Sequence, residues 1–401
     1  MNIYSITSPQ VVNQSRGYNL AVSLLVYHTF ISTSLILPVF GFSSMILVII
    51  NFIGVFSLIV FHSRKITKWA FNLIFIILIF TFFKVAFFYE FRFFKINIFL
   101  ITSILLLSAT NYTELKGFTE VSSKIFITML IGALIGFIVN QIGITYIYSY
   151  VAQNGREQFL YYTTFGHSAG SILRPSGIYD EPGTLAFMTG GLLVLRQLFS
   201  LDQKRSLMIL LLGFITFSLS FLVFSIFYVA AINLSKGQRS SILSVLVVFL
   251  SLIYITGFDS LLEDNLFSRF TLSQDARQGI RGGRETLFWN AYENLSFKDG
   301  SVFWGVNPYC TINNAECLKK GYMSENPLAP IAEHGIFIAW PYYIFILITI
   351  FISFKGRRYL IFFALMSLFL QRPYLLNYGV SLLGILPIYL FFMRKKYNLK
   401  L

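Results

Sequence analysis

The stretch LRPSGIYDEPGTLAF, residues 173 to 187, places an Arg, an Asp and a Glu within eight positions, in a sequence otherwise dominated by Leu, Ile, Phe and Val. The planar guanidinium of Arg174 suits phosphate oxygens, because it can donate two parallel hydrogen bonds. Asp180 and Glu181 directly precede a Pro-Gly pair that marks the start of a helix, where carboxylates also favour the positive end of the helix dipole. The stretch therefore predicts an anion site, a charged helix start, or both.

A second group of arginines occurs in RQGIRGGRETLFW, residues 277 to 289. Arg277, Arg281 and Arg284 accompany two glycines just before an expected amphipathic helix that starts near Glu285. Gly-rich backbone that enters a helix beside arginines can cradle an anion. The same composition is also typical of a solvated basic turn.

A third group occurs in SENPLAPIAEHGIF, residues 324 to 337, which leads into an apolar run. Its carboxylates and imidazole could act as a general base towards a hydroxyl group. Glu325 is the better candidate because it lies farther from the apolar run, whereas His334 can equally be a helix-end residue at the membrane interface. Asn326 directly follows Glu325.

The elements that must position these groups are membrane helices. The chain has 401 residues, of which 56% are hydrophobic and 12% are charged, whereas an ordinary soluble domain has about 25% charged residues. Apolar runs occur at residues 20 to 40, 44 to 61, 69 to 88, 96 to 109, 125 to 148, 183 to 199, 206 to 217, 219 to 235, 241 to 258, 335 to 354, 359 to 372 and 378 to 393. This pattern predicts an all-α polytopic membrane protein that forms a single domain, residues 1 to 401, with about twelve spans.

Charge predicts the orientation of these spans. The thirty residues from 206 to 235 are read as two short helices broken around FSLSF, residues 217 to 221, because the basic segments HSRKITK, DQKR, SKGQR, KGRR and RKK then share one side. By the positive-inside rule that side is the cytoplasm and holds both termini. The net charge of +14 is explained in the same way, and it does not indicate nucleic-acid binding.

The same orientation places two long segments outside, residues 149 to 182 and residues 259 to 334. The second contains most of the acidic residues together with apolar and aromatic ones, so we expect a folded, partly helical outer loop. It also holds both cysteines, Cys310 and Cys317. In an oxidising compartment these could form a disulfide, and otherwise they are two free thiols.

The order of these motifs resembles the O-antigen polymerase and ligase superfamily of bacterial envelope proteins. The resemblance covers roughly residues 165 to 350 and rests on RPSGIYDEPGTLAF, the Ser-marked break in LLLGFITFSLSFLVFSIF, GRETLFWNAYENL with VFWGV, and ENPLAPIAEHGIF. It implies a metal-independent glycosyltransferase of the bacterial inner membrane that acts at the periplasmic face on glycan carried by undecaprenyl diphosphate. No cofactor is implied, and a flippase and a chain-length regulator of the same pathway are the expected partners.

Site roles follow from the resemblance. Outer-loop arginines would bind the diphosphate, which assigns this role to Arg174 and Arg284, with Arg277 and Arg281 beside them. Asp180, Tyr179 and Asn326 would contact the glycan. These roles are expectations, and they require the fold to bring the residues together.

The identity of the base follows from a difference. Ligases of this superfamily generally carry a His directly before the Asn of the last motif, and many polymerases do too, whereas this chain has Glu325 before Asn326. The difference counts against a ligase and makes Glu325 the analogue of the base, with Glu181 and His334 as the next candidates.

Two other functions remain open. A ligase would transfer the glycan onto lipid A core. A flippase or other transporter would carry the lipid-linked oligosaccharide, although transporters place polar groups near the bilayer midplane. Lys84 and Arg196 are expected instead to snorkel from helix ends to the interface.

Overall fold

A computed structural model describes residues 16–35, 44–62, 64–88, 92–151, 157–169, 172–236, 284–293, 295–298, 300–305, 326–356, 359–376 and 380–393. This part of the chain is mostly helical. Its helices are α1 (Arg16–Val26), η1 (Tyr27–Ile31), α3 (Ser44–Phe61), α4 (Lys68–Phe88), α5 (Arg92–Ala109), α6 (Tyr112–Gln141), α7 (Pro182–Leu198), α8 (Gln203–Gly213), η2 (Phe214–Thr216), α9 (Leu219–Lys236), α12 (Arg284–Glu293), α13 (Ser301–Trp304), α15 (Ala329–His334), α16 (Ile336–Ser353), α17 (Ile361–Gln371), η6 (Tyr374–Leu376) and α18 (Ser381–Phe392).

Three of the described helices are long and apolar enough to cross a membrane, namely α4, α6 and α16. Shorter apolar stretches lie within α3, α5, α9, α17 and α18. Large side chains such as Phe56, Phe82 and Leu347 are exposed on these helices, as expected for surfaces that face lipid. The structure therefore supports a helical membrane protein. The count of twelve spans stays a prediction, and the run at residues 241 to 258 lies outside the described residues.

The expected break near residue 217 is present. Helix α8 ends at Gly213, the short turn η2 follows, and Phe217 adopts a left-handed backbone conformation with φ of 46° before α9 begins at Leu219. The chain reverses direction here, because residues at the start of α8 and at the end of α9 line one pocket. Residues 206 to 235 thus form two helices rather than one.

The all-α expectation is wrong for the first outer loop. The segment holds four strands, β1 (Tyr148–Val151), β2 (Glu157–Tyr161), β3 (Thr164–Ala169) and β4 (Ile172–Gly177). They pair in sequence order as an antiparallel meander, with an irregularity between Phe165 and Gly166. The physical reason is the high content of Tyr, Phe and Thr, which favours strands over helix.

The sheet packs on the last turns of α6. The Thr163 hydroxyl donates to the carbonyl oxygen of Gly132 at 2.6 Å. One turn later, a side chain at Gly136 would overlap with Thr164, so glycine permits the strand to approach the helix closely. The sheet is thereby fixed beside α7, into which β4 leads.

Helix α7 lies in the centre of the core, and nearly all its residues are buried. Gly190 and Gly191 allow Leu368 of α17 and Leu383 of α18 to pack against its backbone. Helix α9 packs against both α7 and α17. Because its surroundings are apolar, polar groups at the ends of α7 stand out.

The snorkelling expected of Lys84 and Arg196 is wrong, because each residue is only 2% exposed. The Arg196 guanidinium donates to the hydroxyls of Ser123 at 2.7 Å and Ser206 at 2.9 Å and to the carbonyl oxygen of Asp202 at 2.6 Å. The Lys84 ammonium lies 5.8 Å from the centre of the Trp304 ring. Partners at the helix ends hold both cations inside the protein.

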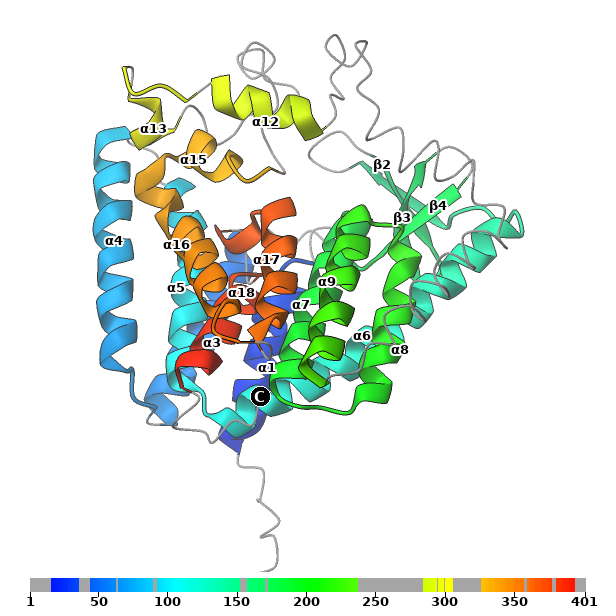
Figure 1. Cartoon of the computed structure of the whole chain (residues 1–401). Coiled ribbons are helices and arrows are strands. Elements are labelled where there is room, and N and C mark those ends of the chain that lie inside the picture. Colours follow the sequence, from blue (N-terminus) through cyan, green and yellow to red (C-terminus); the bar gives the residue numbers. More distant parts are fainter. Residues whose placement is uncertain are drawn as a thin grey trace, which may run out of the picture.

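The two ends of the helix assembly differ in character (Figure 1). The sheet, α12, α13 and α15 lie together at one end, shown at the top of the view. Lys68 and Lys204 lie in the first turns of α4 and α8, and Lys355 follows the end of α16, so these three cations belong to the other end. The segments expected outside the membrane therefore share one end of the molecule.

Candidate functional site

The start of α7 combines a tight turn with a helix N-terminus. Glu181 is the N-cap residue with extended backbone (φ of −139°), and Pro182 occupies the first helical turn. The carbonyl oxygen of Glu181 accepts from the backbone amides of Thr184 and Leu185. The Glu181 side chain makes no capping hydrogen bond, so its carboxylate is available for another partner.

That partner is Arg372, which follows α17. Its Nη2 lies 2.9 Å from Oε2 of Glu181, and both side chains are largely buried, with 7% and 14% exposure. The guanidinium also donates to the Tyr374 hydroxyl and lies over its ring. A side chain at Gly183 would overlap with this guanidinium, so glycine lets the arginine rest against the first turn of α7.

Sequence reasoning missed Arg372. The residue closes the apolar run at residues 359 to 372, and Pro373 follows it. Charged residues close to a span are functional candidates because exposure to lipid is costly, so position alone marked this arginine. Nothing in the sequence indicates that Arg372 pairs with Glu181, which lies 191 positions away.

Asp180 lies beside this ion pair. Its Oδ1 accepts from the Thr184 hydroxyl at 3.1 Å, and its carbonyl oxygen accepts from the Gln158 amide of β2 at 2.6 Å. Burial, followed by the negative charge of Glu181, raises the pKa of the Asp180 carboxyl, while Arg372 opposes the shift. The raised pKa makes this carboxylate a better proton acceptor than an ordinary aspartate.

Arg174 lies on β4 and is half-buried. Its Nη2 donates to the carbonyl oxygen of Phe217 at 3.1 Å, the residue at the break between α8 and α9. One hydrogen bond thus ties the outer sheet to the helix break. The Arg174 guanidinium is planar and carries five N–H donors, and its forked shape suits an anion.

Two residues expected to contact the glycan are buried. Tyr179 is fully buried in the core beneath the turn, and burial raises the pKa of its hydroxyl. Asn326 is 3% exposed, and its Oδ1 accepts from the backbone amides of Leu328 at 2.9 Å and Ala329 at 3.0 Å. In this conformation Asn326 holds local backbone in place and Tyr179 packs in the core, and the glycan contact stays a prediction.

A second titratable group lies in α15. The Nε2 of His334 is 3.9 Å from Oε2 of Glu333. Burial raises the pKa of Glu333 to about 8, whereas burial together with Lys84 lowers the pKa of His334 to about 4. His334 is therefore neutral at pH 7 and a weak base, while the neighbouring Glu333, which was not one of the three named candidates for the base, titrates closer to neutrality.

Several expected site residues cannot be placed. Arg277, Arg281, Glu325, Cys310 and Cys317 lie outside the described residues. Arg284 begins α12, as the expected helix start near Glu285 required, but its side chain is not among those described. The described ranges contain no group of three or more His, Cys, Asp or Glu residues that could hold a metal ion.

The described groups can act together on an anionic substrate. Asp180, Glu181 and Arg372 meet at the start of α7, and Arg174 lies on β4, the strand that leads into it, where it is bonded to Phe217. This arrangement offers guanidinium groups to an anion and a carboxyl group with a raised pKa to a proton. The sequence matches no protein-family model and no curated protein. A function for this chain must therefore be argued from its residues and their geometry.

Proposed function

We propose that this chain is a metal-independent glycosyltransferase of the O-antigen polymerase type. It would join oligosaccharide repeat units linked to undecaprenyl diphosphate into O-antigen or a related polysaccharide at the periplasmic face of the bacterial inner membrane. The observation that carries the proposal is the Glu181–Arg372 ion pair beside Asp180 at the start of α7, with Arg174 on the strand that leads into it. Lipid diphosphate at a bilayer surface would meet the protein at such a place.

The reaction sets clear demands on the site. The acceptor hydroxyl oxygen bonds to the anomeric carbon of the donor sugar, and the bond from that carbon to the diphosphate oxygen breaks. The electron pair leaves with the undecaprenyl diphosphate, whose growing charge arginines can stabilise. The hydroxyl proton passes to a base. Arg174 and Arg372 suit the first task, with Arg284 on α12 as a further candidate.

Among the described carboxyl groups, we assign the role of base to Asp180. Glu181 is engaged by Arg372 at 2.9 Å, so it is better suited to positioning that arginine. His334, with a pKa of about 4, would take up a proton poorly. Asp180 lies beside the Glu181–Arg372 ion pair, and its raised pKa suits proton transfer. Glu325 remains the candidate from the sequence pattern.

A transporter is the second candidate, because one buried polar chain favours it. The Nε2 of His28 lies 2.7 Å from the Ser103 hydroxyl, which lies 2.6 Å from the Ser381 hydroxyl. These hydrogen-bonded groups join η1, α5 and α18. Helix η1 is a π-helix, and such helices often mark functional segments. Polar groups within a helix bundle are typical of substrate or proton pathways.

Deleting the gene and resolving the surface lipopolysaccharide separates these functions. Loss of a polymerase leaves core capped with a single repeat unit. Loss of a ligase leaves bare core and polymer on the lipid carrier, and loss of a flippase leaves bare core without that polymer. An unchanged ladder would exclude all three functions.

Complementation then tests the arginines. Arg174→Gln keeps a donor for the Phe217 carbonyl but loses the charge, so it should abolish chain growth while the protein remains in the membrane. Arg372→Lys should restore growth only in part, since Lys lacks the planar fork. The control is Arg205→Gln at the other end, an exposed residue 3.9 Å from Asp202, which should keep a normal ladder. A normal ladder from Arg174→Gln would contradict the diphosphate role.

A further inference from the structure

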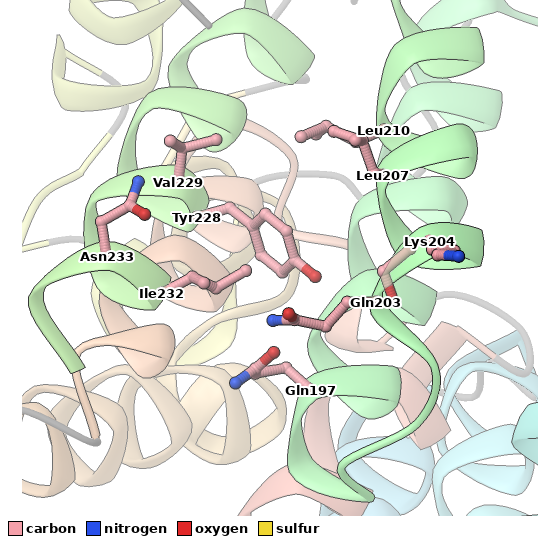
Figure 2. Close-up of a pocket in the computed structure, with 10 residues that line it drawn as sticks. Gln197, Gln203, Lys204, Leu207, Leu210, Tyr228, Val229, Ile232 and Asn233 are labelled. Atoms are coloured by element: carbon pink, nitrogen blue, oxygen red, sulfur yellow. The ribbon is translucent and has the colours of Figure 1, made fainter. Parts of the chain in front are cut away.

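A pocket of about 260 Å³ lies at the end of α7 opposite to the charged cluster. It opens between the start of α8 and the end of α9 (Figure 2). The amides of Gln197 and Gln203 gather below the Tyr228 hydroxyl in this view. Ser206 and Asn233 add two further polar groups to the lining. The pocket therefore offers several neutral hydrogen-bonding groups in a confined space.

The remaining walls of the pocket are apolar and continue onto the outer surface. Leu210, Val229 and Ile232 line the inside, and Leu207 belongs to both surfaces, because it lines the pocket and is 49% exposed. Further exposed apolar side chains extend from there along α8 and α9: Leu211, Ile226, Phe227 and Leu234. A pocket that opens onto a surface of this kind is suited to a ligand with acyl chains.

The electrostatic field at this end is positive. Arg196 lies directly behind Ser206, and it donates only to hydroxyls and a carbonyl oxygen among the described residues. Lys204 stands at the rim, with its ammonium directed away from Tyr228. Arg205 is 3.9 Å from Asp202, and the Asp202 and Glu120 carboxylates also attract the Arg196 guanidinium, whereas Lys204 belongs to none of the described ion pairs. An anionic ligand is favoured over a neutral or zwitterionic one.

We propose that this pocket binds the headgroup of an anionic glycerophospholipid. Its headgroup hydroxyls would bond to the Gln197 and Gln203 amides, its phosphate would face Lys204, and its acyl chains would follow Leu207 along α8. The volume suits a headgroup rather than a larger ligand, because sites for drug-sized molecules measure about 300–1,000 Å³. The apolar walls distinguish this occupant from a soluble phosphate, which would need none. The proposal does not depend on the glycosyltransferase function.

Native mass spectrometry of the purified full-length protein tests the proposal. Phosphatidylglycerol and phosphatidylcholine with identical acyl chains are titrated separately, and apparent dissociation constants are measured. The wild type should bind the phosphatidylglycerol more tightly. Gln203→Glu, which adds a negative charge at an exposed position on the pocket lining, should weaken phosphatidylglycerol binding about fivefold and leave phosphatidylcholine binding unchanged, since one charge at a membrane surface contributes ~1 kcal/mol.

Two controls make the result specific. Gln141→Glu adds the same charge at an exposed position in the last turn of α6, beside the sheet, and should not change lipid binding. Lys204→Gln should weaken phosphatidylglycerol binding, whereas Lys68→Gln, an exposed lysine on α4, should not. Three outcomes would each overturn the proposal. The test and control variants of a pair could lose binding equally, or the wild type could bind the two lipids equally. Soluble glycerol 3-phosphate could also displace phosphatidylglycerol at similar concentrations.

Discussion

At the scale of single residues, Glu333 illustrates how burial removes a charge that the sequence suggests, whereas its neighbour His334 stays neutral. At pH 7 a free Glu is charged and a free His is mostly neutral, whereas here burial leaves Glu333, with a pKa of about 8, largely protonated. His334, with a pKa of about 4, is neutral. Their contact at 3.9 Å is therefore a neutral one near pH 7.

These shifts predict how stability depends on pH. The pKa of Glu333 is higher in the folded state than in the unfolded state, where it is 4.5. Its contribution to the free energy of unfolding is therefore fully present below pH 4.5 and is lost as pH rises to about 8. The lowered pKa of His334 acts oppositely, and stability rises from about pH 4 to 6.5. Of these two groups, only Glu333 changes stability above pH 6.5, by up to about 2 kcal/mol, since each pH unit contributes ~1.4 kcal/mol.

Thermal unfolding in detergent provides the measurement. The wild-type midpoint should fall between pH 6.5 and 8, and in Glu333→Gln this decline should be absent. Glu293→Gln, at an exposed position on α12, should retain the wild-type decline. A decline that persists in Glu333→Gln would place the titrating group elsewhere.

The sequence identified some of these residues but not their partners. The low frequency of charge marked Arg174, Asp180 and Glu181, and all three lie at the outer-loop end of α7. Arg372 escaped notice because its pairing with Glu181 depends on how α17 packs against α7, which no local pattern encodes. The opposite behaviour of Glu333 and His334 was equally hidden, because burial is a property of the fold.

At the scale of elements, the junction between α15 and α16 depends on glycine. Gly335 has φ of 75° and ψ of 164°, a region that essentially only glycine occupies. A side chain there would also overlap with the carbonyl oxygen of Phe303 in α13. Gly305 adopts similar angles, and a side chain there would overlap with the backbone carbonyl group of Glu333. The two glycines let α13 pack directly on the junction.

Gly335→Ala should therefore destabilise the protein by more than the ~1–3 kcal/mol expected from backbone strain alone. The control is Gly143→Ala, where φ is 83° but no other heavy atom lies within 4 Å of the added carbon. That change carries only the conformational cost of roughly 1–2 kcal/mol. Chemical or thermal unfolding in detergent compares the two, and equal losses would mean that the close packing of α13 contributes nothing.

Hydrophobic periodicity predicted most described helices, including the break at Phe217, because long apolar runs and a Ser-rich interruption are local signals. It placed the start of the fifth span too late, at residue 125 instead of Tyr112, since the first turns of α6 are polar and capped by Asn111 with Glu114. The sheet was missed because its strands lie in a segment judged by its length as a loop. Alternating aromatic residues were the available signal.

At the scale of the whole molecule, charge and fold divide along the same axis. One end carries the sheet and α12, α13 and α15, while Lys68, Lys204 and Lys355 belong to the other (Figure 1). The charged cluster around Glu181 lies at the first end and the polar pocket around Tyr228 at the second. By the positive-inside rule, the second end would face the cytoplasm.

This orientation predicts which positions a membrane-impermeant maleimide reaches in spheroplasts. In a background with Cys310 and Cys317 replaced by Ser, Glu157→Cys and Lys298→Cys should react without permeabilisation, because both positions are exposed at the sheet end. Lys68→Cys and Lys355→Cys, also exposed, should react only after the membrane is opened. The reverse pattern would place the charged cluster on the cytoplasmic side. The proposed reaction uses glycan that has already been moved to the periplasmic side, so this result would remove the topological basis of the polymerase proposal.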